Sequence, residues 1–261
     1  MIQGSQTPAP PPPAKVGPVA GRVPVAPVRL RAVLVVVLTV VTGVTDAIGF
    51  TKLGGVFTSV MTGNMVLLGV AVGRGSMLLA LHTGVAFLAY IAGGFAGAHI
   101  AGTAEHDPDV WPRRVTITLA VELGVLTTFA VAWEATGGRP AAGVTSLLIA
   151  VNAIGLGVQS SAVLRFGVSG LSTTYLTGTL TTVLTSIARR DRFATYARSV
   201  AILCALVGGA CIGALTALRA PLVAPFFQVV PLTAVVAIGA IAFRGSEPSS
   251  EPAGALPSAA P

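Results

Sequence analysis

Charged residues are scarce in this sequence. Only 10% of its 261 residues are Asp, Glu, Lys or Arg, whereas a soluble domain carries about 25%. Hydrophobic residues make up 53% of the chain, and the mean hydropathy is +0.84. The chain therefore has too few charges to cover a water-facing surface, which excludes a soluble globular protein. It predicts an integral membrane protein whose main partner is the lipid bilayer.

Cysteines and recognised ligand-binding motifs are also scarce. Cys204 and Cys211 lie seven residues apart in one apolar run, roughly 10 Å along a helix, too far apart for a disulfide. The basic residues lie at the ends of apolar runs, so the net charge of +7 reflects membrane topology and does not predict a nucleic-acid partner. No P-loop, dinucleotide-binding turn or metalloprotease motif occurs. The sequence thus predicts no cofactor, no metal site and no enzyme.

What the chain does have is long apolar runs, and a crossing needs roughly 20 helical residues. Six runs lack any charged residue, namely 53–73, 75–104, 140–164, 166–188, 199–218 and 220–243. The runs 30–50 and 115–133 contain one acid each. The predicted fold is all-α, a polytopic transmembrane helix bundle of six to eight membrane segments over residues 29–244. Residues 1–28 and 245–261 are rich in Pro, Ala and Ser, which predicts disordered tails.

The chain also resembles itself. A shift of 115 positions lays residues 56–65 (VFTSVMTGNM) over 171–180 (LSTTYLTGTL), and the same shift lays Gly93-Gly94 over Gly208-Gly209. This predicts two internal repeats, about 30–133 and 141–243.

The two Thr-Gly segments, 53–73 and 166–188, are the shortest and most polar of the eight, which favours broken or re-entrant helices. If they span, the repeats are parallel; if they are re-entrant, the repeats are inverted. The excess of Lys and Arg places both termini in the cytoplasm in either arrangement, with eleven basic residues inside against five, or twelve against four.

Polar residues at membrane depth mark the candidate substrate site. A helix that breaks at Gly63 would free backbone groups that must face protein or water. The alternative is that the small residues serve close packing and the Thr hydroxyls bond the preceding turn. The candidate site residues are Asp46, Thr62, Gly63, Asn64, Glu122, Gln159, Thr177, Gly178 and Thr179.

Asp46 and Glu122 are the acids that lie inside apolar runs, where a central charge costs about 2.5 to 3.5 kcal/mol. Each can serve as a proton or ion site, or as a buried structural hydrogen-bonding group. A shift of 113 places Gln159 opposite Asp46, which suggests that an acid and an amide flank a shared central site. Interhelical hydrogen bonding is the alternative for Gln159.

Small residues at helical spacing predict faces for close helix packing, either inside the bundle or in a homo-oligomer. These residues are Gly93, Gly94, Gly97, Gly208, Gly209 and Gly213.

Several blocks of the sequence resemble the signature of the YoaK family of bacterial membrane proteins, also called DUF1275. They are residues 43–48 (GVTDAI), 53–57 (LGGVF) and 61–69 (MTGNMVLLG), and in the second half 157–159 (GVQ), 170–174 (GLSTT) and 176–180 (LTGTL). The resemblance covers roughly residues 30–243. It implies a multi-pass protein of the bacterial inner membrane, and it names no substrate.

Together these patterns predict a small secondary transporter or permease-like protein that moves an unidentified small solute or ion through a polar site at mid-depth. Two other classes stay open: a membrane scaffold or accessory protein, which needs only the packing glycines, and a membrane-embedded enzyme. A polar pocket joining the Thr-Gly segments to Asp46 would favour transport, and a dry centre would favour the scaffold.

Overall fold

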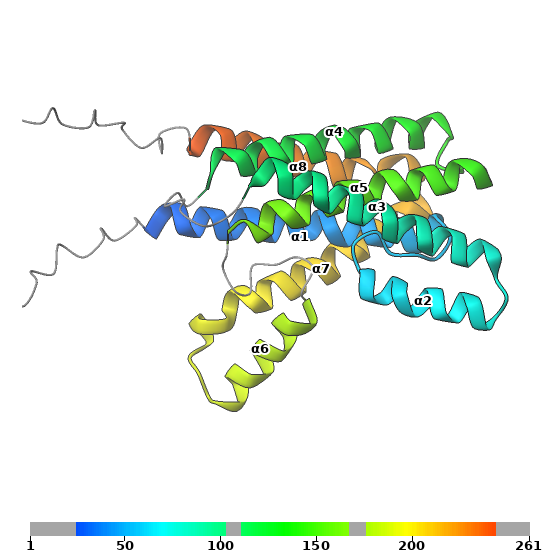
Figure 1. Cartoon of the computed structure of the whole chain (residues 1–261). Helices are drawn as coiled ribbons and strands as arrows, with labels where there is room; N and C mark the ends of the chain where they lie inside the picture. The colour runs from blue at the N-terminus through cyan, green and yellow to red at the C-terminus, as the bar shows by residue number, and fades with distance from the viewer. Residues whose placement is uncertain (1–24, 103–110, 167–175, 244–261) are drawn as a thin grey trace, which may run out of the picture.

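The computed structural model describes residues 25–102, 111–166 and 176–243 (Figure 1), and these contain helices and no strand. The helices are α1 (Val25–Lys52), α2 (Met61–Gly73), α3 (Met77–Ala101), α4 (Arg113–Ala135), α5 (Ala142–Leu164), α6 (Leu176–Ala188), α7 (Phe193–Arg219), the short 3₁₀ helix η1 (Pro221–Val223) and α8 (Phe226–Ala242). The predicted all-α helix bundle is confirmed. Helix α1 begins at Val25, inside the predicted tail 1–28. The remainder of that tail and the tail 245–261 lie outside the described residues.

Six of the described helices are long and apolar enough to cross a membrane. Helices α2 and α6 have 13 residues each, about 20 Å at the helical rise, against roughly 30 Å of hydrocarbon. Of the six, α1 is the most enclosed by its neighbours. Helix α2 lies along α3, helix α6 lies along α7, and both project from the bundle towards opposite ends of it (Figure 1).

Glycines bring the backbones of α3 and α5 together. A Cβ at Gly93 would overlap the carbonyl oxygen of Ile154, and a Cβ at Gly97 would lie 2.9 Å from the Cα of Val158. The contacting residues are four positions further along in both helices at the second contact, so the two helices run parallel to each other. The absence of a side chain at these positions is what allows the approach.

The same contact recurs between α7 and α1. A Cβ at Gly209 would overlap the carbonyl oxygen of Val40, and one at Gly213 would lie 2.7 Å from the Cα of Val44. These two helices are also parallel. In terms of the predicted repeats, the third helix of each half (α3 or α7) packs against the first helix of the other half (α5 or α1).

The two remaining glycines of the predicted packing faces differ from these four. A Cβ at Gly94 or Gly208 would meet nothing within 4 Å. The backbone of Gly94 nevertheless contacts α5, because its carbonyl oxygen accepts a 2.8 Å hydrogen bond from Ser161.

The first helices of the two halves run in opposite directions. Near one end of the bundle Leu34 and Val35 of α1 share an apolar cluster with Val163 of α5, and near the other Ile48 shares a second cluster with Ile149. Because α3 is parallel to α5, it runs opposite to α1. The segment 53–76, with α2 in it, therefore leaves and re-enters the bundle at one end, and α6 does the same at the other end (Figure 1).

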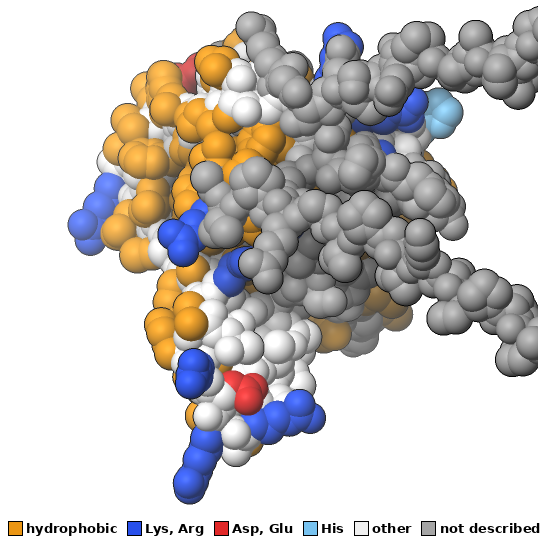
Figure 2. Space-filling model, turned by 90° about the vertical axis from the view of Figure 1, so that its left-hand side faces the viewer, with side chains coloured by type: hydrophobic (Ala, Val, Ile, Leu, Met, Phe, Trp, Pro, Cys, Tyr) orange, Lys and Arg blue, Asp and Glu red, His pale blue; other side chains and the backbone are white. Residues whose placement is uncertain are grey.

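Basic residues gather at the end of the bundle that carries both described termini, where Lys and Arg side chains stand around the edge (Figure 2). By helix order the nine at this end are Arg29, Arg31, Arg113, Arg114, Arg165, Arg189, Arg190, Arg192 and Arg198. The four at the opposite end are Lys52, Arg74, Arg139 and Arg219. The sides of the helices carry exposed apolar residues such as Val72, Phe95 and Val207, the surface that a lipid bilayer requires.

Candidate functional site

Asp46 lies on α1 about one and a half turns before its end, and its carboxylate holds the chain that follows. One oxygen, Oδ1, accepts hydrogen bonds from the backbone N–H of Thr58 (2.7 Å), the hydroxyl of Thr58 (3.0 Å) and the backbone N–H of Ser59 (2.8 Å). The other, Oδ2, accepts from the hydroxyl of Ser59. All three residues are buried. The carboxylate thus satisfies backbone donors that no regular element pairs, as buried amides require.

Asn64 fixes the same segment from the other side. Its Nδ2 donates to the carbonyl oxygen of Phe57 at 2.6 Å, and its Oδ1 accepts from the N–H of Phe57 at 3.0 Å. The side-chain amide therefore pairs with one residue as a neighbouring strand would. Asp46 and Asn64, which the sequence singled out separately, meet on residues 57–59 and form one structural clip.

The break in the first Thr-Gly segment lies before α2 and not at Gly63. The helix begins at Met61, and Gly63 lies in its first turn. The chain leaves α1 through Gly54, whose φ of +91° suits glycine and whose Cβ would overlap the ring of His82. The expected break at Gly63 is thus displaced, because the clip on residues 57–59 ends the irregular stretch and lets the helix start at once.

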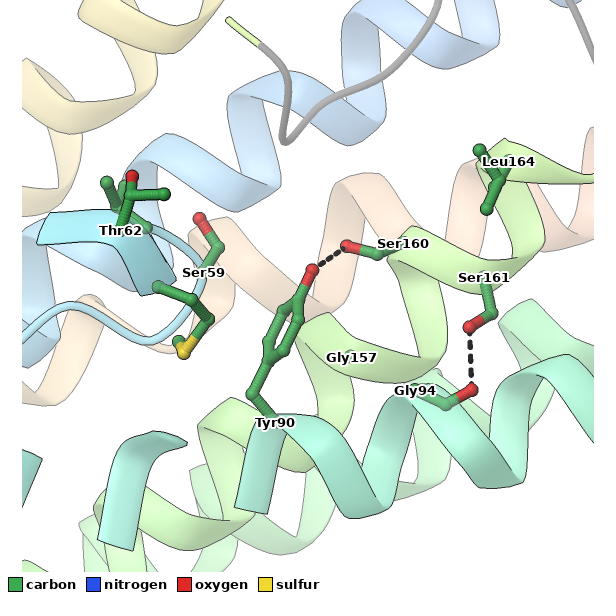
Figure 3. A pocket seen from close by; sticks show the side chains of 10 residues that line it. Ser59, Thr62, Tyr90, Gly94, Gly157, Ser160, Ser161 and Leu164 are labelled. Atoms are coloured by element: carbon green, nitrogen blue, oxygen red, sulfur yellow. Dashed lines mark hydrogen bonds between the residues drawn. The ribbon is translucent and has the colours of Figure 1, made fainter. Parts of the chain in front are cut away.

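A pocket of about 320 Å³ lies beside the start of α2. Five hydroxyl-bearing residues from three parts of the chain line it (Figure 3): Ser59, Thr62, Tyr90, Ser160 and Ser161. The Tyr90 hydroxyl donates to the Ser160 hydroxyl at 2.7 Å. The remaining lining residues are Val60, Met61, Gly94, Gly157 and Leu164. Thr62 is the one predicted site residue among them.

Gln159 does not line the pocket, and its side chain contacts α1. Its Nε2 donates to the hydroxyl of Thr42 at 2.8 Å, one turn before Asp46. From α8, Gln228 donates in the same way to the hydroxyl of Thr45 at 2.9 Å. All of these side chains are buried. Two amides thus meet α1 at neighbouring turns, and the contact of Gln159 is an interhelical hydrogen bond one turn before Asp46.

Glu122 on α4 lies at the level of Gln159. Helices α4 and α5 form an antiparallel hairpin in which a Cβ at Gly155 would lie 3.0 Å from the Cδ2 of Leu126. Four residues further along α5 is Gln159, and four residues back along α4 is Glu122. The Glu122 side chain is 0% exposed.

These residues form a buried polar layer within the apolar core. We define it as Thr42, Thr45, Glu122, Asn152, Gln159 and Gln228. On α1 the layer follows Val41 of the first cluster and flanks Val44 of the second. On α4, Glu122 lies between Leu119 and Leu126, which both belong to the first cluster. Within the part of the chain that the structure describes, several atoms of the layer have no hydrogen-bond partner: both carboxyl oxygens of Glu122, both amide atoms of Asn152, and the Oε1 atoms of Gln159 and Gln228.

The described residues of the predicted site in the second Thr-Gly segment, Thr177, Gly178 and Thr179, belong neither to this layer nor to the described pocket lining. Thr177 and Gly178 are in the first turn of α6, where their carbonyl oxygens accept from the hydroxyls of Thr181 and Thr182. Thr179 is buried, and α6 packs on α7. The preceding residues, 167–175, lie outside the described residues, so the structure describes the environment of only part of this predicted site.

The sequence analysis did not identify Gln228 of the polar layer or Tyr90 of the pocket. Gln228 is an amide in the otherwise apolar run 220–243, and that contrast is the signal that could have found it. Tyr90 lies in the run 75–104 with nothing in its own surroundings to mark it. Across the described ranges, no group of three or more His, Cys, Asp or Glu could hold a metal ion.

Comparison with known proteins places these features in a family. Residues 34–239 match the family described as "Protein of unknown function (DUF1275)". The chain is 33% identical over 213 residues to "UPF0700 transmembrane protein YoaK" of Bacillus subtilis (strain 168), covering 80% of this chain and 92% of that protein. No solved structure matches the chain. The matched range begins and ends within the helix bundle and includes the clip, the pocket and the polar layer, so the chain is a transmembrane protein that belongs to the DUF1275 family.

Proposed function

We propose that this membrane protein is a small secondary transporter in which the polar layer is the coupling site and Glu122 takes up and releases a proton. The observation that carries the proposal is the Glu122 carboxyl, which is fully buried and has no hydrogen-bond partner among the described residues. A structural role would need such a partner. A charged carboxylate without one is expensive at this depth, so Glu122 holds its proton in this conformation.

The rest of the layer supports a site that is filled in part of a transport cycle. Donors and acceptors of Asn152, Gln159 and Gln228 are left unpaired within the apolar core, although native proteins pair nearly all buried polar groups. Amide oxygens and a carboxyl group together are ligands for a proton relay or a small cation. A scaffold would be more stable with an apolar core at these positions.

The placement of the short helices is a second support. Helix α2 begins at mid-depth and returns to one end of the bundle, and α6 returns to the other (Figure 1). Short helices entering from both sides are a recurrent feature of transporters built from inverted repeats. The reciprocal packing of α3 on α5 and of α7 on α1 fits the same duplication, and we include an inverted repeat in the proposal. The excess of basic residues at one end supports a cytoplasmic location for both termini, which we include in the proposal.

The test uses the full chain in liposomes that contain a trapped pH-sensitive dye. Under an imposed proton gradient, a panel of small solutes is added and acidification of the lumen is recorded. Glu122→Gln keeps the shape of the side chain but cannot release a proton, so we expect solute-driven proton movement to fall more than tenfold. Glu134→Gln is the matched control, because Glu134 is an exposed acid at the end of the same helix.

Two results would count against the proposal. If Glu122→Gln acidifies the lumen as fast as the wild-type protein, the coupling role of Glu122 is wrong. If the wild-type protein moves neither protons nor any solute of the panel above the empty-liposome rate, transport is wrong and the scaffold alternative gains.

A further inference from the structure

The pocket beside α2 is separate from the polar layer and has a chemistry of its own. Its polar side chains are all hydroxyls, contributed by Ser59, Thr62, Tyr90, Ser160 and Ser161 (Figure 3). Among the described residues, no Asp, Glu, Lys, Arg or His lines it. Hydroxyls both donate and accept hydrogen bonds, whereas an ion entering the pocket would lose its hydration without meeting an opposite charge.

Hydrogen bonds between α3 and α5 hold three of these hydroxyl groups in place. A Cβ at Gly157 would overlap the carbonyl oxygen of Tyr90, so the two backbones touch at the floor of the pocket. From that contact Ser161 donates to the carbonyl oxygen of Gly94 at 2.8 Å, and Tyr90 reaches Ser160 at 2.7 Å. Both hydrogen bonds are drawn in Figure 3. The hydroxyls thus stand on a rigid pair of helices, as a preorganised site requires.

A helix dipole and a carboxylate of opposite sign lie near the pocket. The first turn of α2, with Thr62, directs the positive end of the helix dipole at the pocket. Directly behind Ser59 lies the Asp46 carboxylate, which accepts both the N–H and the hydroxyl of Ser59. The positive end of the helix and the carboxylate oppose each other, so no unopposed charge next to the pocket attracts an ion of one sign.

From these observations we propose that the pocket binds a small uncharged solute with several hydroxyl or amide groups. The volume of about 320 Å³ lies at the lower end of small-molecule sites. At about 30 Å³ per water, it holds roughly ten non-hydrogen atoms, the size of a five-carbon polyol. An uncharged polar solute would then be the substrate class of the transporter proposed above, and this assignment of a substrate rests on that proposed function.

The test measures binding separately from transport. The full chain in lipid nanodiscs is incubated with radiolabelled ribitol or N-acetylglycinamide, which are uncharged, and with their charged counterparts ribonate and N-acetylglycinate. We expect at least one uncharged probe to bind and its carboxylate counterpart to bind at least tenfold more weakly. Ser160→Ala and Tyr90→Phe should each weaken binding of the uncharged probe about fivefold, the weight of one hydrogen bond.

Thr128→Ala is the matched control, because Thr128 is exposed on α4 and its hydroxyl bonds only its own helix, at the Gly124 carbonyl oxygen. The proposal is overturned if neither uncharged probe binds, if a carboxylate binds as tightly as its uncharged partner, or if the pocket variants bind like Thr128→Ala. Binding without uptake in liposomes would leave the pocket assignment intact and count against transport. Uptake of other solutes without binding of these probes would support transport and count against the pocket assignment.

Discussion

The clip between Asp46 and residues 58–59 allows a direct test of whether this buried acid is structural. Two replacements separate its hydrogen bonding from its charge. Asp46→Ala removes every acceptor that the carboxylate offers to Thr58 and Ser59, and leaves the Asn64 pairing with Phe57 in place. Asp46→Asn keeps an oxygen for the N–H groups of Thr58 and Ser59 and places an amide donor opposite the Ser59 hydroxyl, which can rotate to accept.

The magnitude follows from the donors that lose their partner. The N–H groups of Thr58 and Ser59 belong to residues that are 0% and 4% exposed, so water does not replace the carboxylate without rearrangement. An unsatisfied buried group costs about 1 to 3 kcal/mol, and two amides give about 2 to 6 kcal/mol for Asp46→Ala. In Asp46→Asn the bonds persist without the charge, so we expect a loss of only about 1 kcal/mol.

The assay is unfolding of the purified chain in detergent by denaturant, followed by tryptophan fluorescence. Trp111 and Trp133 are the two tryptophans of the chain, and both are buried, so their emission reports loss of packing. If Asp46→Ala unfolds at the wild-type denaturant concentration, the clip does not stabilise the fold and the reasoning is refuted. If Asp46→Asn is as stable as the wild type but loses proton coupling in liposomes, the acid has a functional role that its hydrogen bonds do not reveal.

Three further predictions concern the packing, the second half of the clip and the topology. Gly93→Ala should lower the stability by about 1 to 3 kcal/mol, because the added Cβ would overlap α5. Gly94→Ala should be neutral or stabilise by up to about 1 kcal/mol, because its Cβ would meet open space. Equal effects of the two variants in a denaturation assay would contradict the packing. Asn64→Ala should remove both hydrogen bonds to Phe57 and lower the stability by about 1 to 3 kcal/mol, and an unchanged denaturation midpoint would count against the pairing. In a cysteine-free background, Arg74→Cys and Arg190→Cys should react with an impermeant maleimide from opposite sides of the membrane, since α2 and α6 return to opposite ends; labelling from one side would remove the inverted arrangement.

The long helices could be predicted from sequence because their cause is local. A run of roughly 20 apolar residues can satisfy its backbone in lipid only as a helix, so the run 75–104 contains α3 at Met77–Ala101 and the run 220–243 contains α8. The run 53–73 shows where this reasoning stops. Its first part, residues 53–60, is as apolar as the transmembrane helices, but hydrogen bonds from the side chains of Asp46 and Asn64 hold it in an irregular conformation. A hydropathy pattern contains no information about such hydrogen bonds.

The site was predicted in part for the same reason. A buried acid is visible in sequence because charge in an apolar run is costly, and this identified Asp46 and Glu122. What sequence could not supply is which of them is paired. Asp46 accepts four hydrogen bonds from the segment it clips, whereas Glu122 has no partner in the described part of the chain. Tyr90 joins the pocket only because glycine lets α3 touch α5, a property of the assembled pair and not of either helix.

The pocket and the polar layer share helix α5 at consecutive residues. Ser160 faces the pocket, and Gln159 faces Thr42 of α1 in the layer. The glycine contacts make α3 with α5, and α1 with α7, two pairs whose backbones touch, so each pair moves more readily as a unit than its members move apart. A displacement of the α3–α5 pair by a solute at Ser160 would therefore shift Gln159 against α1 at the level of Glu122. In the proposed transporter, such a shift would connect solute binding at Ser160 with the proton site at Glu122.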